Sequence, residues 1–315
     1  MQARPKENLR PLRFLLPLIG AVLFSVFPPP PVSWAEEPRW LVDLAWLQTH
    51  LHDEDLILVD TRADKDYAAG HIPRALLLDL ADLAPRTSEQ ELSAFQEELK
   101  KRFALLGYTG SEKVIFYDDG AATRAPHTLW NFMYAGGKNG RVLSGGFAAW
   151  KKAGFPLAWD RFSRPERPFP LNIDSSLLAS SERVNQRLKD FSTIILDVRS
   201  QAEFAGSNPS TGGSRLGHIP GARWLEWTSL LGPDHQYLPP AEMKKKLSEA
   251  GVTPDKEVIV YCHRGNRASN TWLALRALGF FNVRNFIGSW AEWSARLDLP
   301  VAAEKKEAEP ENPAP

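Results

Sequence analysis

The feature that most constrains how this chain folds is an internal repeat of long period. The segment LILVDTRADKDYAAGHIPRA at 56–75 is matched by TIILDVRSQAEFAGSNPSTGGSRLGHIPGA at 193–222. Each copy runs from an apolar strand through Asp-x-Arg and an acidic-aromatic pair to Gly-His-Ile-Pro, and the second copy contains an extra loop rich in Ser, Gly and Asn. Two unrelated domains would not share so many features in the same order, so the repeat predicts two domains with one fold.

The next segment of each copy places an apolar strand before a short polar loop. EKVIFYDDGAATRAPHTLW at 112–130 is matched by KEVIVYCHRGNRASNTWLAL at 257–276, and Asp118 holds the place of Cys262 at an offset of about 143 residues. Helical patterns such as SAFQEELKKRFALLG and AEMKKKLSEAG alternate with these strands. The alternation predicts an α/β fold of two tandem domains, each a mostly parallel sheet with helices on both faces.

The composition of the intervening segments sets the expected domain bounds. A stretch rich in Pro and Arg is expected to link the two domains, and a C-terminal stretch rich in Pro and charged residues is expected to be disordered. The predicted parts are a signal peptide at 1–35, a first domain at 38–157, a linker at 158–173, a second domain at 174–302 and a tail at 303–315.

The N-terminal segment has the pattern of a secretory signal. The basic stretch MQARPKENLRPLR precedes the apolar run FLLPLIGAVLFSVF at 14–27, and the small residues Ser33 and Ala35 follow. This order predicts a periplasmic or secreted protein with cleavage after Ala35. The apolar run is shorter than the about 20 residues that span a bilayer. Retention as an anchor is therefore the second interpretation, and no stable membrane insertion is expected after cleavage.

Charge and cysteine content narrow the classes of partner and cofactor. The chain contains 38 Lys and Arg against 38 Asp and Glu, and this balance argues against nucleic acid as the main partner. The histidines show no close metal-binding spacing and one cysteine cannot form a thiolate cage, so no metal or other cofactor is expected. A single cysteine also cannot form an internal disulfide.

That cysteine, Cys262, lies where a strand is expected to end and a helix to begin. The run VIVY before it predicts a buried strand, and ASNTWLALRALGF at 268–280 has apolar residues at helical spacing. Free N–H groups at a helix start favour an anion, and Arg264 and Arg267 add positive charge. These features favour the thiolate, and Gly265 lets the loop turn without a Cβ clash. Cys262 is therefore predicted to be a nucleophile beside a site for an anionic group.

Taken together, these segments resemble the tandem-domain rhodaneses, a family of sulfurtransferases. The resemblance covers roughly residues 40–302. It depends on CHRGNR as a Cys-x-x-Gly-x-Arg loop, on the paired Asp-x-Arg and Gly-His-Ile-Pro segments, and on the closing segments RVLSGGFAAW and RNFIGSWAEW. In that family the N-terminal half keeps the fold without the nucleophile. Asp118 at the place of Cys262 implies the same division here, because a carboxylate cannot accept sulfur as a persulfide.

The resemblance implies a ping-pong transfer of sulfane sulfur without a cofactor. The Cys262 thiolate takes the outer sulfur of a small donor such as thiosulfate, sulfite leaves, and cyanide or a thiol acceptor removes the sulfur from the persulfide. The loop backbone at His263, Gly265 and Asn266 is expected to hold the persulfide. Arg264 favours thiosulfate, because relatives that prefer 3-mercaptopyruvate tend to have an uncharged loop.

Other interpretations stay open. The donor can be 3-mercaptopyruvate, or Cys262 can belong to a non-catalytic module that binds sulfur or senses redox state. A related type of phosphatase is disfavoured, because it uses Cys-x5-Arg whereas Cys262 and Arg267 form Cys-x4-Arg. The His263 side chain either tunes the thiolate or faces solvent, and the second interpretation is preferred.

Several side chains have both a substrate-binding and a structural interpretation. Arg199 maps onto a family arginine that binds the donor anion, or it pairs with Glu203 four residues on. Arg267 contacts the donor anion, or it braces the loop through a fork to a carboxylate. His218 recurs in the first half as His71, where no chemistry is expected, so it is interpreted as a fold residue.

Overall fold

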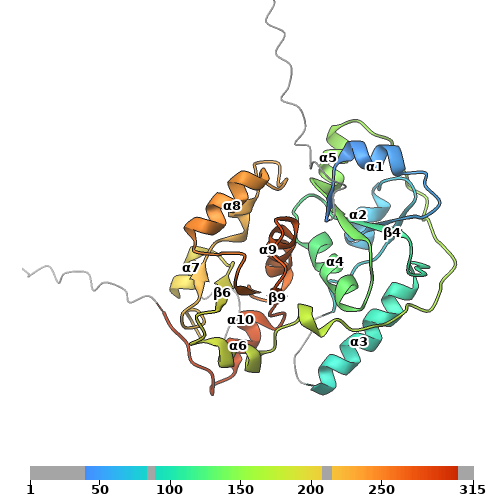
Figure 1. Ribbon diagram of the computed structural model, residues 1–315. Coiled ribbons are helices and arrows are strands. Elements are labelled where there is room, and N and C mark those ends of the chain that lie inside the picture. The colour runs from blue at the N-terminus through green and yellow to red at the C-terminus, as the bar shows by residue number, and fades with distance from the viewer. Residues whose placement is uncertain (1–39, 84–88, 208–214, 304–315) are drawn as a thin grey trace, which may run out of the picture. The chain divides into compact units, whose positions relative to one another are not determined.

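Two separate parallel sheets carry the two repeats of the sequence (Figure 1). The computed structural model describes residues 40–83, 89–207 and 215–303, which belong to one compact unit. The predicted signal peptide and nearly all of the predicted tail lie outside the described residues, as does most of the extra loop of the second repeat.

In the described part of the chain, the first sheet has five strands in the order β1-β5-β4-β2-β3, and their pairs are all parallel. Every residue of β2 is buried, as expected of a parallel sheet covered on both faces. At the end of the β2–β4 pair, Asp60 lies opposite Tyr117. The strands are β1 (Leu41–Val42), β2 (Leu56–Asp60), β3 (Ala75–Leu77), β4 (Lys113–Tyr117) and β5 (Gly140–Leu143).

The second sheet repeats this arrangement. Among the described residues it has four strands in the order β7-β6-β8-β9, again all parallel, and Asp197 lies opposite Tyr261 as Asp60 lies opposite Tyr117. The prediction of two α/β domains with mostly parallel sheets is therefore confirmed. The strands are β6 (Thr193–Asp197), β7 (Arg223–Trp224), β8 (Glu257–Tyr261) and β9 (Val283–Asn285).

Helices provide the crossovers that parallel strands need. In the first half they are α1 (Leu44–His50), α2 (Asp64–Ala68), α3 (Glu89–Ala104), α4 (Arg124–Tyr134) and α5 (Gly146–Lys152). In the second half they are α6 (Ser181–Arg187), α7 (Gln201–Ala205), α8 (Pro240–Glu249), α9 (Asn266–Ala277) and α10 (Ser289–Ala295), with single 3-10 turns at η1 (Ser175–Leu177) and η2 (Trp227–Leu230). Among the residues described, no helix has the length and apolar character needed to cross a membrane.

The Asp-x-Arg segment forms the same hydrogen-bonded ion pair in both halves. The Arg62 guanidinium donates hydrogen bonds to both carboxylate oxygens of Asp60 at 2.6–3.1 Å, and to the carbonyl of the glycine in Gly-His-Ile-Pro at 2.8 Å. Arg199 donates to Asp197 and to the matching glycine carbonyl at the same distances. The motif therefore ties the end of a strand to the next segment, whether or not the half contains a cysteine.

The two matching histidines join the Gly-His-Ile-Pro segment of each half to the C-terminal end of that half. His71 exchanges two backbone hydrogen bonds with Ala158, and its ring stacks on an aromatic ring of α2. His218 exchanges the same two bonds with Ala302 and stacks on an aromatic ring of α7. Because the arrangement recurs in the half that lacks a cysteine, the interpretation of His218 as a fold residue agrees with the structure.

Helices α4 and α9 pack against each other, and each also packs against its own sheet (Figure 1). The α9 side chains from Ala268 to Leu275 are buried, and most of those of α4 are buried as well. This contact joins the helix that follows the Asp118 loop to the helix that follows the Cys262 loop.

Candidate active site

Cys262 lies directly after β8, and α9 begins at Asn266. The five residues of β8 are all buried, and Cys262 itself is 1% exposed. The strand end and the helix start are those the sequence pattern predicted, although the helix begins two residues before the predicted 268–280 segment. The thiol therefore lies at the carboxyl end of a central parallel strand, where α/β proteins commonly build their ligand sites.

Gly265 turns the loop so that its N–H points at the sulfur. The Gly265 N–H donates to Cys262 Sγ at 3.1 Å, and the glycine has a φ of +91°. A Cβ at this position would lie 3.1 Å from the Ile287 carbonyl oxygen and 3.0 Å from the Ile287 side chain. Only glycine combines this left-handed conformation with so close a packing contact.

Ser289, at the start of α10, holds the backbone of the cysteine itself. Its Oγ accepts a hydrogen bond from the Cys262 N–H at 3.2 Å and donates to the Phe286 carbonyl at 2.7 Å. Ser289 is fully buried and has a φ of +52°, a conformation that costs a non-glycine residue about 1 kcal/mol. Ser289 is not among the site residues predicted from the sequence. Its signal is that the first half has Gly146 in the matching place, with a φ of +54°.

The N-terminus of α9 provides donors for an anion next to the sulfur. The first N–H groups of a helix have no intrahelical acceptor, and the helix dipole places partial positive charge there. On the opposite side, the Cys262 carbonyl accepts from the Trp290 N–H and the His263 carbonyl from the Ala291 N–H, each at 3.0 Å. The loop thus directs these two carbonyl groups towards α10, and within the described residues the N–H groups of Asn266 and Arg267 have no hydrogen-bond acceptor.

Arg267 braces this loop. Its guanidinium donates two hydrogen bonds to the Glu203 carboxylate, at 2.7 and 3.0 Å, so the structure shows the fork to a carboxylate. Burial by itself would raise the pKa of Glu203, but the hydrogen bonds and charge of Arg267, with help from Ser200, lower that pKa to about 2. The carboxylate is therefore ionised at neutral pH, and it balances the positive charge of Arg267.

Arg199 does not pair with Glu203, in contrast to the structural interpretation of its spacing. Its guanidinium is 1% exposed and is held by Asp197, with the Trp290 ring 4.6 Å away. The reason is that α7 starts only at Gln201, so Arg199 lies before the helix and the spacing rule for helix surfaces does not apply. A contact between Arg199 and the donor stays a prediction.

The two remaining loop side chains differ in exposure. Arg264 is exposed, and within the described residues its guanidinium has no acidic partner. His263 does not simply face solvent, because it is half-buried and its Nδ1 atom is enclosed without a hydrogen-bond partner among the described residues. Burial, followed by the nearby charge of Arg264, lowers the pKa of His263. The His263 imidazole is therefore neutral beside the thiol at neutral pH.

In the first half, Asp118 fills the position that the sulfur occupies in the second. Its carboxylate accepts hydrogen bonds from five backbone N–H groups at 2.9–3.3 Å. Burial raises the pKa of Asp118, while these donors oppose that shift. From the sequence, Asp118 is a residue at the nucleophile's place that cannot carry sulfur as a persulfide. The structure shows in addition that its own carboxylate occupies the anion site formed by these N–H groups at the start of α4.

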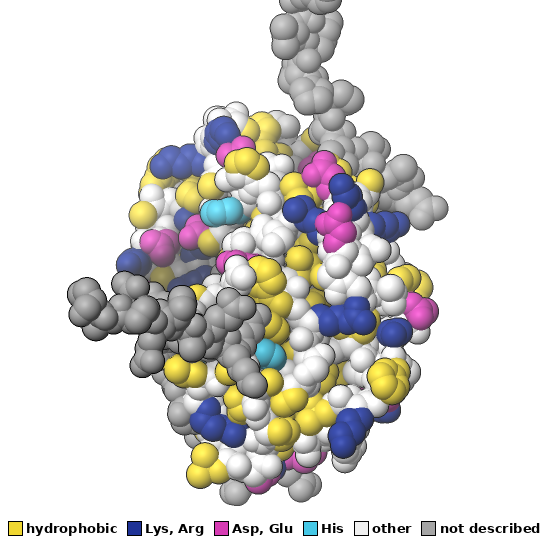
Figure 2. Space-filling view, turned by 90° about the vertical axis from the view of Figure 1, so that its left-hand side faces the viewer, with side chains coloured by type: hydrophobic (Ala, Val, Ile, Leu, Met, Phe, Trp, Pro, Cys, Tyr) yellow, Lys and Arg dark blue, Asp and Glu magenta, His cyan; other side chains and the backbone are white. Residues whose placement is uncertain are grey.

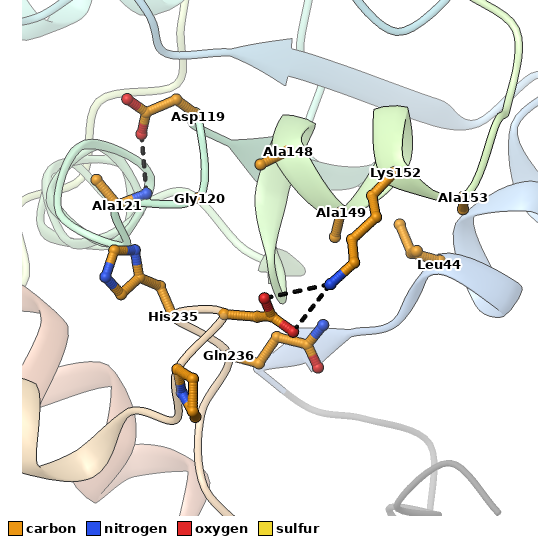
Figure 3. A pocket seen from close by; sticks show the side chains of 12 residues that line it. Leu44, Asp119, Gly120, Ala121, Ala148, Ala149, Lys152, Ala153, His235 and Gln236 are labelled. Atoms are coloured by element: carbon orange, nitrogen blue, oxygen red, sulfur yellow. Dashed lines mark hydrogen bonds and ion pairs between the residues drawn. The ribbon is translucent and has the colours of Figure 1, made fainter. Parts of the chain in front are cut away.

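A cavity of about 610 Å³ lies beside this first-half loop (Figure 3). It is lined by Asp119, Gly120 and Ala121, by alanines of α5, and by a turn of the second half at 233–236. Lys152 and Asp234 form an exposed ion pair across it at 3.2 Å. None of its lining residues belongs to the Cys262 loop, so this cavity is separate from the candidate active site.

Metal-ligating groups give no competing site on the part of the chain that the structure describes. Figure 2 shows basic, acidic and apolar side chains interspersed on the face that it presents. Within residues 40–83, 89–207 and 215–303, no three His, Cys, Asp or Glu side chains are grouped so as to hold a metal ion.

Comparison with known proteins identifies the family. The rhodanese-like domain matches this chain twice, at residues 43–153 and 180–296. The chain belongs to the rhodanese family. As a rhodanese with two domains, it carries its single cysteine in the second, at the N-terminus of α9.

Relatives of similar length are named for sulfur transfer. This rhodanese is 31% identical to a thiosulfate sulfurtransferase of Azotobacter vinelandii, over 83% of this chain and 96% of the relative. It is also 31% identical to the 3-mercaptopyruvate sulfurtransferase of Escherichia coli, over 83% and 97%, respectively. The same identity, over 84% and 97%, is found with the sulfur carrier protein TtuD of Thermus thermophilus. The chain is therefore a member of a sulfurtransferase family.

Solved structures agree with this assignment. The structure of SseA from Escherichia coli, described as having the rhodanese fold of the 3-mercaptopyruvate sulfotransferases, superimposes with a TM-score of 0.69 at 27% identity, over 80% of this chain and 98% of SseA. An anaerobic ergothioneine biosynthesis enzyme from Chlorobium limicola superimposes with a TM-score of 0.74 at 25% identity, over 85% of this chain and 71% of that one.

Proposed function

We propose that this rhodanese is a thiosulfate sulfurtransferase in which Cys262 carries the transferred sulfur. The observation that carries the proposal is the position of the single cysteine, with a backbone N–H donating to its sulfur at 3.1 Å. A helix N-terminus at this place stabilises negative charge, first on the thiolate and then on the terminal sulfur of a persulfide. No other thiol exists in the chain to perform the reaction.

The transfer divides into two displacements. In the first, the Cys262 thiolate attacks the outer sulfur of thiosulfate and a new sulfur–sulfur bond forms. The sulfur–sulfur bond of thiosulfate breaks, and its electron pair leaves with sulfite. In the second, cyanide or the thiolate of an acceptor attacks the outer sulfur of the persulfide, and the bonding pair returns to Cys262 as thiolate. Charge is conserved in each step, and neither step requires a redox partner.

Arg264 supports thiosulfate as the donor. Its exposed guanidinium is available to a dianion approaching the loop, whereas Arg199 and Arg267 are already engaged by carboxylates. We assign Arg264 as the principal donor contact, with Arg199 and Arg267 holding the surrounding charge in place. The second candidate donor is 3-mercaptopyruvate, because relatives named for either donor are 31% identical to this chain.

The decisive experiment measures intact mass after incubation with each donor. We expect the protein to gain one sulfur, about 32 Da, from thiosulfate and to lose it again on addition of cyanide. The Cys262→Ser variant is the control and should gain no mass. A gain from 3-mercaptopyruvate alone would reassign the donor. Uptake without steady-state turnover would identify a sulfur-binding module, and no uptake from either donor would refute the proposed function.

Export is a separate proposal. The basic stretch, the apolar run at 14–27 and the small residues up to Ala35 support a cleaved signal peptide and a periplasmic location. Expression of the full chain in a bacterium with an outer membrane, followed by mass analysis of the periplasmic fraction, tests it. We expect a mature protein that begins at Glu36, and an uncleaved membrane-bound form would show that the segment is an anchor.

A further inference from the structure

A buried hydrogen-bond relay joins the half without a cysteine to the Cys262 loop. It starts at His127 on α4, which is 4% exposed, and crosses to Ser269 on α9, which is fully buried. His127 Nδ1 lies 3.3 Å from Ser269 Oγ. One residue further along α9, Asn270 Nδ2 donates to the Ala122 carbonyl of the first-half loop at 2.7 Å. The two halves are thus joined by polar contacts close to both loops.

The other contacts of Ser269 fix the direction of this relay. Its hydroxyl donates its one proton to the Gly265 carbonyl at 2.9 Å and accepts from Asn285 Nδ2 at 2.9 Å. The remaining lone pair can only accept, so His127 donates through an Nδ1–H. Burial lowers the pKa of His127 to about 4, and its imidazole is therefore neutral at neutral pH and carries a single proton.

The Gly265 carbonyl is the point at which the relay reaches the site. This carbonyl and the Asn266 N–H belong to one planar peptide group, so holding the oxygen fixes the direction of the N–H. The Asn266 N–H is the first of α9, and it follows directly after the Gly265 N–H that donates to Cys262 Sγ at 3.1 Å. Because Gly265 has no Cβ to limit its rotation, the orientation of this peptide depends on its hydrogen bonds.

We propose that His127 is a positioning residue, which acts through Ser269 and the Gly265 carbonyl to set the direction of the first N–H of α9 in the Cys262 loop. The half that contains no nucleophile thereby contributes to the chemistry of the other. The effect on sulfur transfer rests on the proposed function, but the effect on the thiolate does not. His127 itself touches neither the donor nor the sulfur.

The test compares His127→Asn with His127→Leu. These two side chains have nearly the same size and shape, but only the Asn amide places an N–H at the position of imidazole Nδ1. We expect His127→Leu to lower kcat with thiosulfate by roughly threefold to tenfold, the effect of losing one buried hydrogen bond. KM should stay within a factor of two. His127→Asn should retain at least half of the wild-type kcat, because it restores the donor.

A double-mutant cycle with Ser269→Ala tests the route. If His127 acts through Ser269, then His127→Leu should cause little further loss of kcat once Ser269→Ala is present. An equal loss of kcat in the Asn and Leu variants would overturn the proposal. So would an effect confined to KM, or a full additional loss in the Ser269→Ala background.

Alkylation of Cys262 by iodoacetamide at pH 7 provides a readout that needs no sulfur donor. The thiolate is the reacting form, so weaker support from the Asn266 N–H should slow alkylation in His127→Leu at least twofold and leave His127→Asn close to wild type. This result would stand even if the protein transferred sulfur from neither donor. Equal or faster alkylation in His127→Leu would refute the positioning role independently of the proposed function.

Discussion

Replacing Glu203 by Gln removes the charge that holds Arg267 against the Cys262 loop. The substitution keeps the shape of the side chain, and Gln can complete the capping box that Glu203 forms with Ser200 at the start of α7. The Glu203 side chain is 5% exposed and that of Arg267 24%. The change therefore leaves a largely buried guanidinium without its counter-charge.

The size of the effect follows from the pKa of Glu203. Folding lowers this pKa from 4.5 to about 2, a difference that corresponds to about 3 kcal/mol of preference for the ionised form. Partial solvent screening of Arg267 reduces the expected loss. We expect Glu203→Gln to lower the free energy of unfolding by about 2 kcal/mol at pH 7.

The pH dependence identifies the ion pair as the cause. Because folding depresses the pKa, the stabilisation is complete above pH 4.5 and is lost as the pH falls towards 2. The difference between the wild type and the variant should therefore fall to less than half when urea unfolding, followed by tryptophan fluorescence, is repeated at pH 3. Other carboxylates titrate in both proteins and cancel in the difference.

A matched control is Glu249→Gln. Glu249 forms an exposed pair with Lys245 at 3.9 Å, with side chains 64% and 78% exposed, and this change should cost less than about 0.5 kcal/mol at either pH. A Glu203→Gln variant that is no more destabilised than Glu249→Gln at pH 7 would refute a stabilising Glu203–Arg267 ion pair. A loss of stability in Glu203→Gln that is the same at pH 3 as at pH 7 would refute it as well.

Substitutions at three further positions test the loops of the two halves. Asp118→Ala removes the acceptor of five N–H groups and should lower the free energy of unfolding in urea by about 3 kcal/mol. A loss below about 1 kcal/mol would show that these hydrogen bonds do not stabilise the loop. Ser289→Ala and Ser289→Gly both lose the contact to the Cys262 N–H, but only Ser289→Gly relieves about 1 kcal/mol of backbone strain, so Ser289→Ala should be the less stable variant. Thermal melts that rank the two variants in the opposite order would refute this. Arg264→Ala should raise KM for thiosulfate about tenfold with an unchanged melting temperature, and an unchanged KM would show that Arg264 does not contact the donor.

The architecture was predictable because its signals are local and occur twice. Each strand is a run of apolar residues, and each half repeats the same order of strand, Asp-x-Arg and Gly-His-Ile-Pro. Such runs must be buried on both faces of a sheet wherever they lie, so they indicate a parallel α/β fold without knowledge of partners. The position of Cys262 at a strand end followed for the same reason, since β8 and α9 are both visible in the sequence.

The partners of the charged side chains were not predictable in the same way. The spacing of Arg199 and Glu203 indicated a pair on a helix, but the helix begins after Arg199, and an arginine outside a helix follows a different geometry. Arg199 instead forms an ion pair with Asp197, and the Glu203 carboxylate pairs with Arg267. A boundary shift of one or two residues is enough to change a pairing, and the sequence does not fix boundaries to that accuracy.

The sequence by itself determined which chemical groups are present and in what order: one thiol, the arginines of its loop, and a carboxylate in the matching place of the first half. The tertiary structure decided what each group contacts. Arg267 meets a carboxylate 64 positions away, and Ser269 meets His127 142 positions away. The physical reason is that secondary structure depends on neighbours along the chain, whereas a buried hydrogen bond depends on how separate elements pack. The sequence therefore points to the nucleophile, and only the packing of α4, α7 and α10 around the Cys262 loop and α9 reveals the groups that support it.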